Sequence, residues 1–277
     1  MAKTTAISWT EATWNPWYGC TKVSPGCANC YMFRDMARYD KDPSATVRSA
    51  TRFDQPLKWR EPRLIFTCSW SDWFHERADE WRAEAWDVIR RTPWHTYQIL
   101  TKRPERIRRS LPDDWGDGWP NVWLGTSIES QRFDWRAAAL CEVPAAIRFV
   151  SAEPLLGPLD LTRVNWWPDA RARRAVVQNE SFRPVNVLPR GGRIYPHKGP
   201  IHWVIAGGES GPEDTRREMD LGWMAALAKQ CAANGAAFFC KQDSSGRAGK
   251  RGRIPDHIWN RKQMPAPRAG GSNGEQV

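Results

Sequence analysis

Three cysteines stand within eleven residues near the beginning of the sequence, at Cys20, Cys27 and Cys30, in the spacing C-x6-C-x2-C. Thiolates this close in a chain converge on a metal or a cluster, or two of them form a disulfide and one is left over. The chain has seven cysteines, and in a reducing compartment they favour metal binding, catalysis or buried thiols over disulfides. The cysteine segment is rich in Gly and Pro, which predicts a loop, and we expect a helix after it.

The spacing favours an iron–sulfur cluster over zinc. Structural zinc takes four ligands, usually as two close pairs, and only one C-x2-C pair is present here. Cys68 or His75 could complete a zinc site, although neither has zinc-finger spacing. A cluster held by three cysteines needs no fourth protein ligand. Its open iron can bind S-adenosylmethionine, and reductive cleavage of that molecule yields a 5′-deoxyadenosyl radical able to attack C–H bonds.

A second constellation consists of carboxylates at the ends of predicted strands. Each follows a small residue after an apolar run, and the positions are Ser127 with Glu129, Ser151 with Glu153, and Gly207 and Gly208 with Glu209. If these strands are parallel neighbours, the carboxylates meet at one rim, where cations or hydrogen bonds must offset their repulsion. A ligand ammonium would serve, as would Lys102 and Lys241, and the glycine pair would let a ligand approach the backbone. The alternative is that each glutamate caps a helix or binds local amides.

Strand and helix patterns alternate over most of the 277 residues. Apolar runs predict strands at residues 6–9, 63–69, 96–101, 121–127, 147–151, 202–206 and 236–240, and helices over 31–39, 78–91, from Ser130 and from Asp220. This alternation predicts parallel strands with crossover helices. Because polar residues gather just after the strands, as in barrel enzymes, we expect an α/β fold with a full or partial (β/α) barrel and not an open doubly wound sheet.

Two segments break the alternation. Residues 165–200 are long, rich in Arg and Pro and weakly patterned, so they are interpreted as an inserted loop or subdomain, or as a surface excursion without fixed structure. The tail 264–277 is expected to be disordered. We therefore predict one domain over residues 1–263, with the insertion inside it.

Charge and composition point to a polyanionic partner. The formal charge is +10 with a pI of about 9.5, which favours nucleic acid, although a basic surface without a binding role is the alternative. Some of the eighteen tryptophans must line the core and others could stack on bases, and the sequence does not sort them. There is no apolar run of about 18 residues and no apolar signal segment, so we expect no membrane span and a cytoplasmic location.

Several motifs occur in an order that is similar to a known family. They are TWNP at residues 13–16, GC at 19–20, GCANCY at 26–31, SDWFH at 71–75, LTKRP at 100–104, NVWLG at 121–125, RFVSAEPLLG at 148–157, WVIAGGESG at 203–211 and FFCKQ at 238–242. The chain resembles the phage and prophage "three-Cys-motif" proteins, which are regarded as relatives of the radical S-adenosylmethionine superfamily. The resemblance covers about residues 9–242 and leaves the 165–200 insertion out.

The resemblance implies a partial (β/α)6-type TIM-like barrel, with a [4Fe-4S] cluster on Cys20, Cys27 and Cys30. It also implies contacts to the ammonium and ribose of S-adenosylmethionine near the strand ends, where the candidates are Ser127, Glu129, Glu153, Gly207, Gly208 and Glu209. Asp72 and Lys102 are the next rim candidates. An electron donor of the flavodoxin or ferredoxin type is implied as a partner, and a further partner protein is possible.

The leading hypothesis is a radical S-adenosylmethionine enzyme that acts on a nucleic acid or nucleotide, in lesion repair or in modification of a DNA or tRNA base. Cys68, Asp72 and Lys102 are its catalytic candidates. Cys68, Cys141 or Cys240 could donate a hydrogen atom, although such thiols are more often small buried residues. The alternative is a nucleic-acid-binding protein in which zinc or an iron–sulfur cluster serves folding alone. A hydrolase using the rim carboxylates ranks last because it leaves the cysteine loop without a role.

Overall fold

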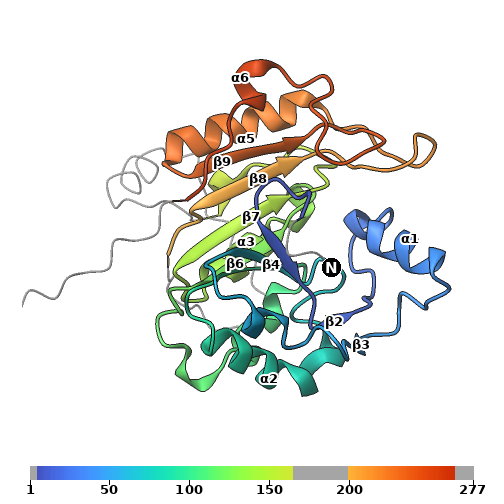
Figure 1. Cartoon of the computed structure of the whole chain (residues 1–277). Coiled ribbons are helices and arrows are strands. Elements are labelled where there is room, and N and C mark those ends of the chain that lie inside the picture. Colours follow the sequence, from blue (N-terminus) through green and yellow to red (C-terminus); the bar gives the residue numbers. More distant parts are fainter. Residues whose placement is uncertain (1–4, 165–198, 266–277) are drawn as a thin grey trace, which may run out of the picture.

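The sheet of this protein has seven parallel strands whose order in space follows their order in the chain. The structure, a computed structural model, describes residues 5–164 and 199–265. The strands are β1 (Ala12–Trp14), β4 (Leu64–Thr67), β5 (Thr96–Thr101), β6 (Val122–Ser127), β7 (Ile147–Ala152), β8 (Trp203–Gly207) and β9 (Ala237–Gln242). A doubly wound sheet would reverse its strand order, and this one does not. The sheet curls into half a barrel, which confirms the predicted α/β partial-barrel fold (Figure 1).

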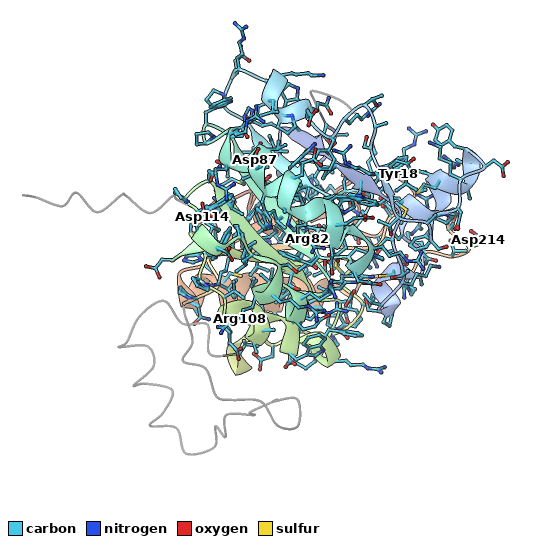
Figure 2. The ribbon with its side chains drawn as sticks, turned by 90° about the horizontal axis from the view of Figure 1, so that it is seen from below. Tyr18, Arg82, Asp87, Arg108, Asp114 and Asp214 are labelled. Carbon is cyan, nitrogen blue, oxygen red and sulfur yellow. The ribbon has the colours of Figure 1, made fainter. Side chains whose placement is uncertain are left out.

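Most of the helices cover the outer side of the sheet. The helices are α1 (Tyr31–Arg38), α2 (Asp79–Arg90), α3 (Trp135–Cys141), α5 (Leu221–Asn234) and α6 (Asp256–Trp259), and a small ribbon pairs β2 (Trp17–Tyr18) with β3 (Val47–Arg48). Short 3₁₀ turns are η1 (Pro25–Cys27), η2 (Gln55–Lys58), η3 (Glu76–Ala78), η4 (Pro104–Arg106), η5 (Arg108–Ser110), η6 (Asp113–Trp115), η7 (Gln131–Phe133) and η8 (Leu161–Arg163). Figure 2 looks onto the side where α2 carries Arg82 and Asp87. In Figure 1, α1 stands apart from the sheet, on the side toward which the strand arrows point.

Side-chain alternation divides each strand into an outer and an inner face. Along β6 to β9, one set of residues packs under the helices, and the other set points into the half-barrel. The inner cluster consists of Trp9, Phe66, Trp123, Ile147, Phe149, Trp203, Ile205 and Phe239. Gly125 makes room for this packing, because a Cβ there would lie 2.3 Å from the ring of Phe149. These aromatic residues form a plug that fills the half-barrel up to the carboxyl ends of its strands.

Most predicted elements lie within two residues of their observed bounds, but two predictions were wrong. The first strand is Ala12–Trp14 and not residues 6–9; Trp9 instead joins the inner plug, with its ring centroid 4.7 Å from that of Phe66. The helix expected from Ser130 begins as a 3₁₀ turn without a side-chain cap, and α3 starts only at Trp135. Asp220 does cap α5, accepting a hydrogen bond from the amide of Gly222 at 2.7 Å.

The predicted insertion and tail fall largely outside the described residues, at 165–198 and 266–277. Within residues 5–164 and 199–265, no helix is long and apolar enough to cross a membrane.

Candidate functional site

A cavity of about 640 Å³ lies at the carboxyl ends of the strands, above the aromatic plug. Its lining includes all three loop cysteines, the strand-end residues Cys68, Asp72, Lys102, Ser127, Ser151, Glu153 and Lys241, and residues of α1 and of the loop after β9. The inner face of the strands therefore changes from aromatic to small and polar where it meets the cavity. This is the face on which barrel folds carry their active sites.

The cysteine loop reaches this cavity from the side of α1. Cys27 is buried in η1, and Cys30 immediately precedes α1. Gly19, at φ +91°, donates its amide to Trp70 O at 3.0 Å, and a Cβ there would collide with the carbonyl of Ala45. Burial raises the pKa of the Cys20 thiol to about 12 and also raises that of Cys30. Without a metal the two thiols are thus neutral, and metal binding would release their protons.

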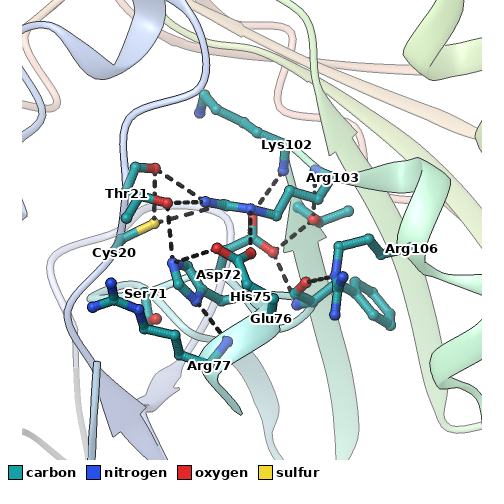
Figure 3. A network of polar contacts seen from close by, with 12 residues as sticks. Cys20, Thr21, Ser71, Asp72, His75, Glu76, Arg77, Lys102, Arg103 and Arg106 are labelled. Atoms are coloured by element: carbon teal, nitrogen blue, oxygen red, sulfur yellow. Dashed lines mark hydrogen bonds and ion pairs between the residues drawn. The ribbon is translucent and has the colours of Figure 1, made fainter. Parts of the chain in front are cut away.

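Arg103 ties this loop to the strands (Figure 3). Its guanidinium donates to Thr21 O at 3.1 Å and to Thr21 Oγ1 at 2.7 Å, and Nη1 lies 3.7 Å from Cys20 Sγ. The same Nη1 pairs with Asp72 Oδ2 at 3.3 Å. Both side chains of this ion pair are about 6% exposed, so the charges are held almost out of water. Arg103 was not among the predicted site residues, because no local pattern marks a side chain that bridges residues 82 positions apart.

The side chains of Asp72 and His75 both form hydrogen bonds to other groups of the protein. Asp72 accepts hydrogen bonds from Thr101 Oγ1 at 2.6 Å and from the amides of Phe74 and Lys102 at 2.9 and 2.8 Å. His75 Nδ1 accepts from the amide of Arg77, so Nε2 carries the proton and donates to Thr21 Oγ1 at 3.1 Å. Burial and Arg103 lower the pKa of His75, which keeps the ring neutral. Both ring nitrogens of His75 therefore already have hydrogen-bond partners, and Asp72 holds Phe74, Thr101 and Lys102 in place.

The three predicted carboxylates do follow adjacent parallel strands, β6, β7 and β8. Each one has its own basic partner: Arg136 Nη1 lies 3.1 Å from Glu129, Lys241 Nζ lies 2.9 Å from Glu153, and Arg217 pairs with both oxygens of Glu209. The cations that offset their repulsion thus come from the protein, and Lys241 is the one that the sequence indicated. Lys102 faces the cavity without joining a carboxylate among the described residues.

Two of these carboxylates hold the cysteine loop in place. Glu129, only 1% exposed, accepts from Ser24 Oγ at 2.6 Å. Glu209 accepts from Asn29 Nδ2 at 2.9 Å, and Arg217 donates to Pro25 O at 3.0 Å. Burial alone would raise the pKa of Glu209, but the hydrogen bonds from Arg217 and Asn29 lower it below its usual value. Neither glutamate lines the cavity.

Glu153 is the carboxylate that remains in the cavity. Its side chain is 13% exposed, and Ser151 Oγ donates to its Oε2 at 3.4 Å. Gly207 leaves the space for it, since a Cβ there would lie 2.6 Å from Glu153 Oε1. Gly208 packs against the backbone of Ser244, so neither glycine lines the cavity itself.

The fourth thiol in the cavity is Cys68, at the end of β4. Its backbone is in the left-handed region, at φ +61°, which is strained for a residue with a Cβ. Its amide donates to Trp14 O at 3.0 Å, and burial raises the pKa of its thiol. By contrast, Cys141 and Cys240 are buried outside the cavity, Cys240 against Met224 Sδ at 3.5 Å.

Cysteine thiolates are ligands of both zinc and iron–sulfur clusters. Within the described ranges, no three His, Cys, Asp or Glu side chains gather closely enough to hold one metal ion. Tetrahedral zinc, with Zn–S near 2.3 Å, needs its sulfur ligands within about 4 Å of one another. A [4Fe-4S] cluster takes each thiolate at a separate iron, so its ligands lie around a larger group. Three cysteine thiols line one cavity, with Arg103 beside Cys20, so residues of the type that holds a [4Fe-4S] cluster are present there.

A family model described as "Protein of unknown function (DUF5131)" matches residues 4–262. Neither a curated protein nor a solved structure matches the chain.

Proposed function

The chain belongs to the DUF5131 family, and from its cavity we propose that it is a radical S-adenosylmethionine enzyme acting on nucleic acid. The observation that supports this most is the joint lining of one cavity by Cys20, Cys27 and Cys30 and by the polar ends of the parallel strands. A metal that served folding alone would have no need of an adjoining cavity. A barrel's strand ends are also where a cofactor and a substrate can be held side by side.

Cys20, Cys27 and Cys30 would ligate a [4Fe-4S] cluster. When bound, such a cluster supplies an open iron for the amino and carboxylate groups of S-adenosylmethionine and the electron that cleaves its C–S bond. Arg103, whose Nη1 lies 3.7 Å from Cys20 Sγ, would donate a hydrogen bond to that thiolate of the cluster. The aromatic plug closes the base of the cavity and keeps water away from reactive species formed above it.

Glu153 and Lys241 form the site for the methionine end of the cofactor. In the structure they neutralise each other at 2.9 Å. A zwitterionic amino acid can satisfy both, its ammonium on the carboxylate and its carboxylate near the lysine. Ser127 and Ser151 place hydroxyl groups in the same cavity, where they can bond ribose oxygens.

The two other hypotheses are less well supported. A hydrolase needs one rim carboxylate held in the protonated form near neutral pH, whereas each of the three here lies beside a cation. A metal-stapled nucleic-acid-binding protein accounts for the basic charge but leaves the Glu153–Lys241 pair and the cavity unused.

Anaerobic reconstitution with iron and sulfide, followed by EPR of the reduced protein, tests the proposal. We expect a cubane signal that changes when S-adenosylmethionine is added and that is lost in Cys27→Ala. Cys231→Ala is the matched control, because Cys231 is a buried thiol of α5 outside the cavity, and it should keep the signal. If the protein held one zinc ion tightly and took up no iron, the proposal would be wrong. A nucleic-acid-binding protein whose metal serves folding alone would then be the better hypothesis.

Glu153→Gln should separate cofactor binding from cluster binding. The change keeps the shape of the side chain and removes the charge that would meet the ammonium, so the affinity for S-adenosylmethionine should fall about 10- to 100-fold. The measurement is a titration of the EPR change with S-adenosylmethionine. Iron content should stay the same, as should both quantities in Glu80→Gln on the exposed side of α2. Loss of iron in Glu153→Gln would instead give Glu153 a role in holding the cysteine loop.

A further inference from the structure

The structure shows which tryptophans pack against other side chains and which do not, a distinction that the sequence could not make. Nearly all of those in the described residues lie against another ring or a cation. Trp223 is packed against the larger core cluster. Trp70 alone among the described tryptophans has no ring or cation against it and no place in either core cluster, and it lines the cavity half-buried.

The backbone of Trp70 is nevertheless fixed. Its amide donates to Asn15 Oδ1 at 2.8 Å, and its carbonyl accepts from the amide of Gly19 at 3.0 Å. The Trp70 ring contacts no other ring among the described residues, and two hydrogen bonds fix its backbone, so the ring is a preorganised stacking surface. It suits a planar ligand, because little freedom remains to be lost on binding.

Three cations of the cavity are also without a counter-charge among the described residues. They come from three separate elements: Arg34 from α1, Lys102 from the end of β5 and Arg247 from the loop after β9. The other two cations of the lining are neutralised, Lys241 by Glu153 and Arg103 by Asp72. Figure 3 shows the Lys102 side chain extending away from the Arg103 network. The lining also includes Asp35, but its five cations exceed its three acids, Asp35, Asp72 and Glu153, so the charge left available in the cavity is positive.

S-adenosylmethionine does not account for this charge. Its sulfonium and ammonium groups outweigh its one carboxylate, so it carries a net charge of about +1 and would be repelled by Arg34, Lys102 and Arg247. A [4Fe-4S] cluster on three thiolates would carry a net charge of about −1 or −2, so the cluster and S-adenosylmethionine together offset only part of the charge of the three cations. The positive charge that remains favours a further, anionic occupant of the cavity. An occupant with both a planar ring and phosphate groups is a nucleotide.

We propose that the cavity binds one nucleotide of a single-stranded nucleic acid, with its base stacked on Trp70 and its neighbouring phosphates bound by Arg34, Lys102 and Arg247. This inference deepens the proposed function by naming the substrate unit that the cofactor would face. The three cations come from three separate elements around a cavity of about 640 Å³, which is too small for a duplex. A base must be flipped out of its stack before it can react in such a cavity.

Binding of a fluorescein-labelled ten-nucleotide single strand, followed by anisotropy, tests this. Trp70→Ala should weaken binding about 5- to 100-fold, whereas Trp70→Phe should keep most of the affinity because it keeps a ring. Arg34→Glu and Arg247→Glu should each weaken binding and lower the slope of log K against log salt by about 0.7 or more. Arg38→Glu is the matched control: it lies on the same helix, 71% exposed and outside the cavity, and should change little.

Three outcomes would overturn the proposal. Equal affinity for a mononucleotide and for the ten-nucleotide strand would assign the cavity to a free nucleotide. An equal loss in Arg38→Glu would assign binding to the general surface. If Trp70→Ala spared the strand and weakened the EPR change with S-adenosylmethionine, Trp70 would belong to the cofactor's adenine. Strand binding needs neither iron nor cofactor, so its failure can be told apart from failure of the proposed radical chemistry.

Discussion

Arg103→Met should lower the free energy of unfolding of the metal-free protein by about 3–5 kcal/mol, the usual effect of breaking a buried ion pair by removing one partner. The variant leaves Asp72 charged at 5% exposure and leaves Thr21 O and Oγ1 without their donor. Because these bonds connect the cysteine loop to the strands, the iron bound after reconstitution should fall as well. Urea unfolding gives the first quantity and iron analysis the second.

The control for this prediction is Arg90→Met on α2. Arg90 pairs with Asp114 at 2.9 Å, but the two side chains are 46% and 56% exposed, so the loss should stay within about 1 kcal/mol. A double-mutant cycle with Asp72→Asn should show coupling between the two sites. Similar losses in Arg103→Met and Arg90→Met, with no coupling to Asp72, would contradict the role given to Arg103.

Glu129→Ala should have a comparable effect on stability and a larger one on the cluster. It leaves the guanidinium of Arg136, 2% exposed, without its charge partner, and Ser24 without its acceptor. We expect a loss of about 3–5 kcal/mol in the free energy of unfolding and little bound iron. The measurements are urea unfolding and iron per chain after anaerobic reconstitution.

Two smaller substitutions distinguish the effect of loosening the cysteine loop from the effect of breaking the Glu129–Arg136 ion pair. Ser24→Ala removes the bond to Glu129 and keeps the pair with Arg136, so stability should change by only about 1 kcal/mol while iron binding falls. Gly26→Ala should act in the same direction, because its Cβ would lie 2.4 Å from Glu129 Oε1. If Glu129→Ala kept its iron and lost only the response to S-adenosylmethionine, Glu129 would be a cofactor ligand, as the sequence resemblance implied.

The fold could be predicted because each buried parallel strand is recognisable from its own short stretch of sequence. Runs such as 203–206 are continuously apolar and are followed by small residues, and the barrel rule places the ends of such strands together. The same rule brought Cys68, Lys102, Ser127 and Glu153 to the cavity. It failed to predict the first strand because Trp9, a strong strand former, contributes its ring to the plug and not its backbone to the sheet.

The individual roles of the carboxylates could not be predicted. Glu129, Glu153 and Glu209 stand in the same local context, two residues after an inner-face position, and only their partners differ. Two of those partners, Ser24 and Asn29, come from distant parts of the chain, and none of the partners has a pattern that marks it. The same holds for Trp70, whose sequence context resembles that of the buried Trp73 three residues later.

The anchoring of the cysteine loop sets an order of events during synthesis. Its contacts span 105 residues to Glu129, 180 to Glu209 and 192 from Pro25 to Arg217. At about 5–20 residues per second, the ribosome needs about 10–40 s to go from the loop to its last anchor. Throughout that interval the three thiols are exposed on a nascent chain that cannot yet hold them in place. The anchored form of the loop, which the proposed cluster would require, therefore exists only after Arg217 has been made, and until then the thiols depend on the reducing power of their surroundings.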